Sequence, residues 1–156
     1  MNFPVLSIIA FTPITAALII LLIPADRKNA ARAVALAAAS FALILSLWMY
    51  FNYDQTTAGY QFIEKYDWLP ALGISLHFGV DGISAPLVLL TGVVMFTGVL
   101  ISWGDDHPHV MAGIQDRPRE FFAFLFILAT GVVGVCGSRE LFMLSFFYDS
   151  AVFPVY

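Results

Sequence analysis

The hydrophobic pattern of the chain consists of long apolar runs, uncharged except for one aspartate in the last, separated by polar connections. Four runs have 18 to 22 residues and the last has 16; they cover residues 5–24, 33–53, 83–104, 121–138 and 141–156. A helix of about 20 residues crosses roughly 30 Å of hydrocarbon. The pattern therefore predicts an all-α, polytopic membrane protein with about five transmembrane helices, forming one membrane domain over residues 1–156.

The charges of the connections predict an orientation. Five of the seven Lys and Arg residues lie in the first and third connections: Arg27, Lys28, Arg32, Arg117 and Arg119. Basic residues accumulate on the cytoplasmic side of membrane proteins. We therefore expect these two connections to face the cytoplasm and the N-terminus to lie outside. Both lysines of the chain, Lys28 and Lys65, are expected to lie outside the helices.

The second connection, residues 53–82, is the only sizeable stretch outside the apolar runs. Residues 74–78 alternate between apolar and polar side chains, which predicts a short extended segment between the second and third helices. His77 lies in this segment and is a possible secondary proton-relay residue, because histidine titrates near neutral pH. A hydrogen-bonded surface histidine is the interpretation we favour. Asp81 is expected to cap the third helix.

Composition excludes several classes of protein. Hydrophobic residues make up 60% of the chain and charged residues 12%, about half the charged fraction of a soluble domain. No basic patch indicates nucleic-acid binding, and the one cysteine, Cys136, excludes a disulfide framework within the chain. Four neighbouring residues have donor types that suit a divalent metal but match no closed metal-site spacing: Asp105, Asp106, His107 and His109.

Three glycines recur at every third position of the fourth apolar run, at Gly131, Gly134 and Gly137. In lipid, small residues let the backbones of two helices approach closely. We interpret this stripe as a packing signal rather than a chemical one.

Asp149 is a carboxylate inside the otherwise uncharged fifth run. At about 1.5 Å per residue it lies roughly 13 Å along the helix from Glu140, near the bilayer midplane. An ionisable group there is by default a candidate for a proton or ion pathway. Asp149 is therefore our principal site residue, with Glu140 at the outer mouth of the helix as a possible secondary one. The alternative is a protonated acid hydrogen-bonded within the membrane, for example to Ser145.

Two stretches of the chain resemble a known family. Residues 64–84, EKYDWLPALGISLHFGVDGIS, and residues 140–156, ELFMLSFFYDSAVFPVY, resemble subunit M of NADH-quinone oxidoreductase. This is the bacterial counterpart of mitochondrial subunit 4 of respiratory complex I. The resemblance runs through essentially the whole chain but covers only the N-terminal third of family members. In the family the fifth-helix acid is normally glutamate, whereas here the matching residue is Asp149.

The resemblance implies a membrane-arm subunit of a proton-translocating NADH:quinone oxidoreductase in the bacterial cytoplasmic membrane. Such a subunit contributes part of a proton pathway and contains no redox centre, so the isolated chain is not expected to be catalytic. NADH, FMN, iron–sulfur clusters and quinone are expected in partner subunits. The expected partners are the other membrane subunits of complex I and the lipid bilayer. The lysines that partner the acid in the family lie beyond residue 156.

Two other functions remain open at this point. The chain could belong to a multisubunit cation/proton antiporter or a membrane-bound hydrogenase, whose subunits share the fifth-helix acid. Alternatively, it could be a non-conducting structural fragment that packs against other membrane subunits through its glycine-lined fourth helix.

Overall fold

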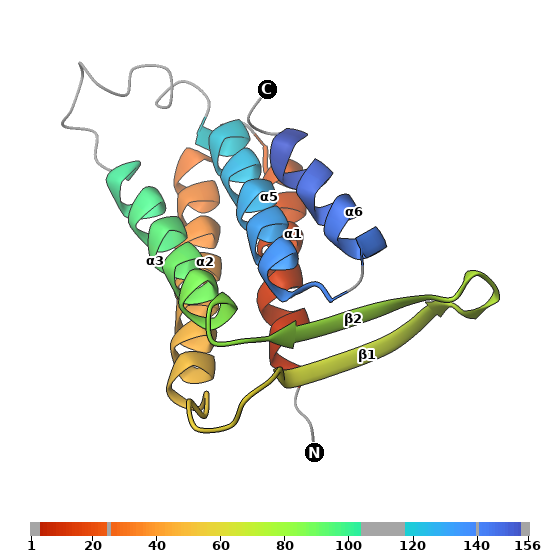
Figure 1. The fold of residues 1–156 in the computed structure, drawn as a ribbon. Coiled ribbons are helices and arrows are strands. Elements are labelled where there is room, and N and C mark those ends of the chain that lie inside the picture. The colour runs from red at the N-terminus through yellow and green to blue at the C-terminus, as the bar shows by residue number, and fades with distance from the viewer. Residues whose placement is uncertain (1–3, 25, 104–117, 140, 154–156) are drawn as a thin grey trace.

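The computed structural model describes residues 4–24, 26–103, 118–139 and 141–153. The elements in chain order are α1 (Val5–Leu22), α2 (Lys28–Phe51), β1 (Gln61–Leu69), the 3₁₀ turn η1 (Pro70–Leu72), β2 (Ile74–Val80), α3 (Ser84–Ile101), α5 (Pro118–Gly137) and α6 (Leu141–Val152). Figure 1 shows the four long helices side by side, with α6 against α5 and the β1–β2 hairpin lying across one end of the bundle.

Four helices in the described part of the chain are long and apolar enough to cross a membrane: Val5–Leu22, Lys28–Phe51, Ser84–Ile101 and Arg119–Gly137. Helix α6 has 12 residues. Its rise is about 18 Å, which is less than the thickness of the hydrocarbon core. The predicted mostly helical fold with long apolar helices is confirmed for these four candidate membrane spans, and a fifth full span is not among the residues that the structure describes.

Helix α2 begins five residues earlier than the apolar run at 33–53, so Lys28 and Arg32 both belong to it. The expectation that Lys28 lies outside the helices is therefore wrong. Lysine, arginine and alanine all favour helical backbone. The exposed Lys28 can also keep its charge in water while the stem of its side chain follows the helix end. An apolar run alone therefore underestimates where such a helix starts.

Small side chains let the four long helices pack closely. Alanines recur every three or four residues on the buried face of α2: Ala31, Ala35, Ala39 and Ala42. They form one core cluster with Ala16, Ala17 and Ile20 of α1, Met95 and Val99 of α3, and Phe122 and Phe126 of α5. The two phenylalanine rings fill the space that the alanines leave, so large and small residues alternate across this interface.

The glycine stripe of α5 packs against α6 and the hairpin. A Cβ added at Gly131 would lie 2.6 Å from the Ala151 Cβ, and one at Gly134 would overlap the Phe147 ring. At Gly137 the nearest atom would be in the Phe78 ring, at 3.4 Å. The prediction that these glycines serve close packing is confirmed, and the element that requires it is mainly α6.

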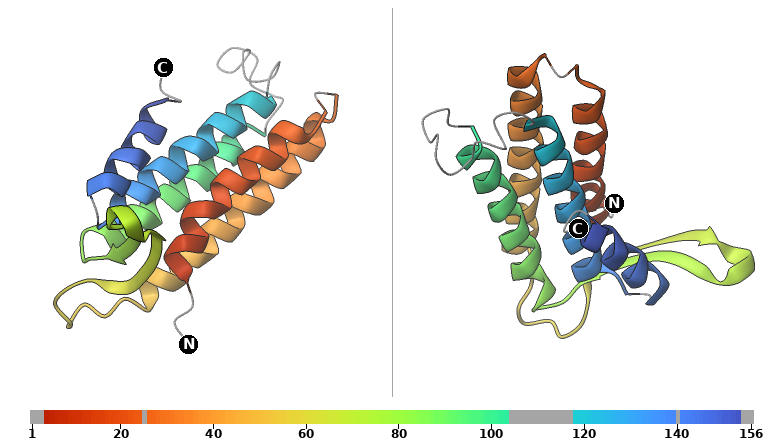
Figure 2. Two further views of the ribbon diagram at one scale, coloured as in Figure 1. Left: turned by 90° about the vertical axis from the view of Figure 1, so that its right-hand side faces the viewer. Right: turned by 90° about the horizontal axis from the view of Figure 1, so that it is seen from above.

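The extended segment expected between the second and third helices is an antiparallel hairpin. Gln61 on β1 pairs with Val80 on β2, and Lys65 pairs with His77. The strands are joined through η1 and Gly73, whose φ of 69° is in the left-handed region that glycine adopts without steric cost. Figure 2 shows the hairpin running across the end of the bundle and projecting beyond it.

Glu64 attaches the hairpin to the start of α1. Its carboxylate accepts hydrogen bonds from the backbone N–H of Leu6 at 2.7 Å and of Ser7 at 3.0 Å, and from the Ser7 hydroxyl. The side chain is only 7% exposed. Pro4, at the N-cap of α1, provides no capping side chain. Since the first N–H groups of a helix have no partner within it, Glu64 supplies the acceptors from another element.

We predict that Gly134→Ala and Gly131→Ala destabilise the protein by about 1–3 kcal/mol each, because the added methyl group overpacks the α5–α6 contact. Gly98→Ala is the matched control, because its Cβ would meet Leu125 at an ordinary 3.4 Å. Unfolding in detergent, followed by circular dichroism, measures the three free energies. Equal stability of all three variants would contradict the packing described.

Removal of the Glu64 carboxylate is predicted to cost about 1–3 kcal/mol, because buried N–H donors then lose their acceptor. The test is Glu64→Ala compared with Asp67→Ala, since Asp67 is an exposed acid on the same strand. Glu64→Gln keeps one acceptor oxygen and is expected to lie between Glu64→Ala and wild type. If Glu64→Ala and Asp67→Ala unfold at the same denaturant concentration, Glu64 does not cap α1.

Candidate functional site

Asp149 lies on the side of α6 that faces away from α5. Phe147 and Ala151, four residues apart, form the side of α6 that packs on the α5 glycines. Asp149 follows Phe147 by two residues, or about 200° around the helix, and is exposed. Within the described part of the chain it makes no hydrogen bond or ion pair. The alternative bond to Ser145, one turn earlier, is not formed, and Ser145 is exposed too.

The surface around Asp149 is apolar. The exposed side chains of α6 include Leu144, Phe146, Tyr148 and Val152. A carboxylate facing lipid at the centre of a membrane helix costs roughly 2.5–3.5 kcal/mol on insertion scales. This surface is therefore unsuited both to bulk water, because of its apolar side chains, and to lipid, because of Asp149.

His77 lies beside the residues that precede α6, whereas Asp149 lies further along that helix. It sits on β2 opposite Lys65, and its Nε2 is 3.1 Å from Nη1 of Arg139. Arg139 precedes the start of α6, whereas Asp149 comes eight residues after Leu141, about 12 Å along the helix. The structure thus does not bring these two candidates together. Glu140, the other secondary candidate, lies outside the described residues.

Asp81 caps α3, as its position predicted. Its Oδ1 accepts the N–H of Ser84 at 2.7 Å and that of Ile83 at 3.1 Å. These hydrogen bonds, above all those from Ser84, lower the pKa of Asp81 below its usual 3.8. Hydrogen bonds from Thr56 and Thr57 likewise lower the pKa of the exposed Asp54 to about 2. Both acids are therefore ionised near neutral pH and serve local structure.

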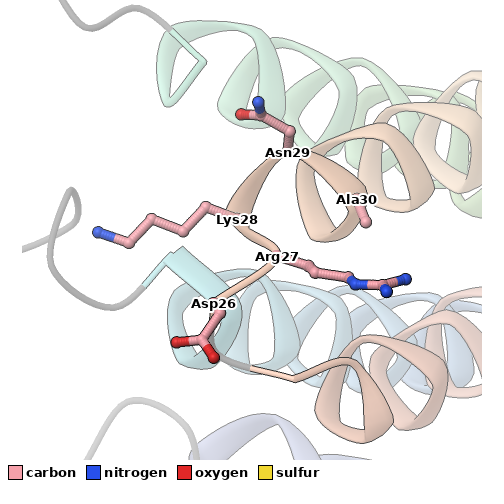
Figure 3. Close-up of a pocket in the computed structure, with 5 residues that line it drawn as sticks. All are labelled: Asp26, Arg27, Lys28, Asn29 and Ala30. Atoms are coloured by element: carbon pink, nitrogen blue, oxygen red, sulfur yellow. The ribbon is translucent and has the colours of Figure 1, made fainter.

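A pocket of about 380 Å³ lies at the opposite end of the bundle from the hairpin. Its lining comes from the connection between α1 and α2 and the first residues of α2: Asp26, Arg27, Lys28, Asn29 and Ala30. In Figure 3, the Lys28 side chain extends away from the helices, while Arg27 extends in the opposite direction alongside them. The polar side chains do not point toward one common position, so the pocket is a charged surface rather than a binding site with converging ligands.

The described residues contain no group of three His, Cys, Asp or Glu side chains that could hold a metal ion. The weak candidate cluster at Asp105, Asp106, His107 and His109 lies outside the residues that the structure describes.

Two residues with clear roles were not identified from the sequence. Glu64 could be counted only as one acid of the outer connection, although the missing cap at Pro4 was a signal that α1 needs acceptors from elsewhere. Arg139 could be assigned only to the mouth of the fifth helix. Gly79, two residues after His77, was the available sign of a close approach, since its Cβ would lie 2.8 Å from Arg139 Cδ.

The known proteins that are similar in sequence to this chain share one description. No protein-family model matches the chain. It is 32% identical over 158 residues to an NAD(P)H-quinone oxidoreductase chain 4 of Trichormus variabilis, covering 99% of this chain and 27% of that protein. Chain 4 proteins of Synechocystis and Trichodesmium erythraeum are 33% and 34% identical, each covering 99% of this chain and 26% of the relative.

A solved structure shares the fold. A chain of respiratory complex I from Thermus thermophilus with bound NADH superimposes with a TM-score of 0.72 at 21% sequence identity, covering 96% of this chain and 27% of that one. The chain thus spans about a quarter of the length of the proteins it matches. The resemblance to subunit M is thus confirmed as a similarity to NAD(P)H-quinone oxidoreductase chain 4 proteins that runs along 99% of this chain.

Proposed function

We propose that this chain is the N-terminal portion of a membrane-arm subunit of a proton-translocating NAD(P)H–quinone oxidoreductase. The whole-length similarity to chain 4 proteins carries this proposal. The four apolar helices and the shared fold with a complex I chain support it. The relatives favour this function over a cation/proton antiporter subunit or a membrane-bound hydrogenase, since the relatives cited carry the quinone oxidoreductase name.

Within such a subunit, Asp149 is the proposed proton-pathway residue. It is an acid on an apolar surface of a helix whose other side is occupied by α5. A carboxyl group in that setting can hold a proton when it is neutral and release it when a cation approaches. We propose that later helices of the subunit, corresponding to the rest of the relatives' length, cover this surface and provide the cation.

The proposed orientation places the hairpin and the N-terminus outside, in a bacterial cytoplasmic membrane. Several basic residues gather at the end of the bundle opposite the hairpin: Arg27, Lys28, Arg32 and Arg119. Arg119 Nη1 donates to the Ile23 carbonyl at 3.0 Å, which joins α5 to the α1–α2 connection at this end. Basic residues concentrate on the cytoplasmic side, so this end is the proposed cytoplasmic face.

The proposed partners are the other membrane subunits of the complex and the lipid bilayer. NAD(P)H, FMN, iron–sulfur clusters and quinone would bind to partner subunits, and this chain would form part of the enzyme as a non-redox subunit of the translocase. Its own residues would bind and release protons, orient α6 and exclude water from the helix bundle.

We predict that Asp149→Asn, introduced into the subunit in its native membrane, lowers NAD(P)H-driven proton translocation by about tenfold or more. A positioned acid–base group typically contributes about 10²–10⁴-fold to the rate of proton transfer, and asparagine cannot titrate. Proton uptake by inverted membrane vesicles measures the effect. Asp149→Glu, which restores the acid usual in the family, is expected to retain translocation.

The matched control is Ser145→Ala, which changes an exposed polar side chain on the same side of α6, one turn earlier. It is expected to leave translocation unchanged. Full proton translocation by Asp149→Asn would exclude Asp149 from the pathway. That result, together with unchanged assembly and quinone reduction, would favour the structural alternative, in which the chain only packs against its neighbours.

A further inference from the structure

Arg139 joins the hairpin to the short connection between α5 and α6. Its backbone N–H donates to the His77 carbonyl at 3.0 Å, and the preceding Ser138 forms an isolated β-bridge with Phe78. The guanidinium carbon lies 4.2 Å from the centroid of the Tyr60 ring, a cation–π contact. Since α6 begins two residues after Arg139, this joint determines where α6 starts.

Gly79 allows the Arg139 side chain to lie against strand β2. A Cβ at Gly79 would be 2.8 Å from Arg139 Cδ and 3.4 Å from Tyr60 Cβ. Any larger residue would push the arginine stem away from the strand. The absence of a side chain here brings the guanidinium to His77, whose Nε2 is 3.1 Å from Arg139 Nη1.

The contact with Arg139 is compatible with only one protonation state of His77 if it is a hydrogen bond. An arginine guanidinium is always charged and has only donors. The His77 Nε2 must therefore accept, which requires a neutral imidazole with its proton on Nδ1. Protonation would turn the acceptor into a second donor and place two positive charges side by side.

Charged groups among the described residues also face His77 from the neighbouring elements. From β1, Lys65 lies directly opposite His77, and Asp67 is the diagonal neighbour two residues further along. From the α5–α6 connection the facing charge is Arg139, which lies over the Tyr60 phenol ring. While the contact with Arg139 is closed, a charged imidazole would lie against the guanidinium, so this contact disfavours the charged form of His77.

We propose that His77 and Arg139 form an acid-sensitive latch between the hairpin and the start of α6, closed when His77 is neutral and released when it takes up a proton. This proposal does not rest on the proton-pathway function of Asp149. The released state binds one proton more than the closed state, so the closed state gains stability as the pH rises and loses it as the pH falls. Histidine titrates near neutrality, which makes the latch responsive to the pH at the hairpin end of the bundle.

The test is hydrogen exchange of the 156-residue chain in lipid nanodiscs between about pH 5 and pH 8, the range over which histidine changes charge. After correction for the intrinsic pH dependence, the Arg139 and Gly79 amides of the wild type are expected to exchange about tenfold faster at the acid end, because local opening exposes them. In His77→Gln, whose side-chain oxygen accepts at any pH, this acceleration should be absent. His77→Lys, which is permanently charged, should exchange rapidly throughout.

Glu64 is the main competing source of pH dependence, because its protonation also weakens the hold of the hairpin on α1. That effect is common to the wild type and His77→Gln, so the difference between them isolates His77. Equal acceleration in both proteins would overturn the latch. A second measurement needs no variant: ¹⁵N NMR of wild-type His77 at about pH 8, above the histidine range, should show the proton on Nδ1. A proton on Nε2 would equally overturn the proposal.

Discussion

The contact between the glycines of α5 and one side of α6 is the constraint on which the candidate site depends. Gly131 and Gly134 leave no room for a Cβ beneath Ala151 and Phe147, so α6 lies directly on the α5 backbone. In a membrane such close packing replaces the hydrophobic effect as the force that holds helices together. It also determines the rotation of α6 about its axis. Asp149 is thereby turned away from the other described helices.

The hairpin has a comparable organising role at the end of the bundle. Through Glu64 it provides the acceptors that α1 lacks, and through Phe78 and Val80 it closes the core cluster that also contains Val5 and Phe147. Through His77 it contacts the joint from which α6 begins. The hairpin therefore contacts both the first helix and the helix with the candidate acid. A local rearrangement of the hairpin would therefore change its contacts with both α1 and the start of α6.

Sequence patterns predicted most of this architecture because lipid imposes strong and local rules. Long apolar runs identified four of the helices, and the spacing of Gly131 and Gly134 identified a close-packing surface. Asp81 could be recognised as a cap because it lies just before the helix that it caps. Helix ends were less predictable, since Lys28 and Arg32 are good helix formers that an apolar run excludes.

The contacts that depend on distant residues could not be predicted in this way. Glu64 and the residues it caps are separated by 57 and 58 positions, and Arg139 and His77 by 62. No local sequence pattern indicates these pairs. They come together only through the register of the hairpin and its position across the end of the bundle. The direction in which Asp149 faces is of the same kind, since it follows from the docking of α6 rather than from apolarity.

We propose that the Asp149 side of α6 is covered by protein rather than by lipid. The most direct test places a photo-reactive benzophenone residue at Ser145, which shares this side of the helix with Asp149, in the native membrane. We expect crosslinks to a protein segment beyond the residues described. Crosslinks to lipid alone would contradict it, because a carboxylate held against hydrocarbon would then have no partner with which to exchange a proton.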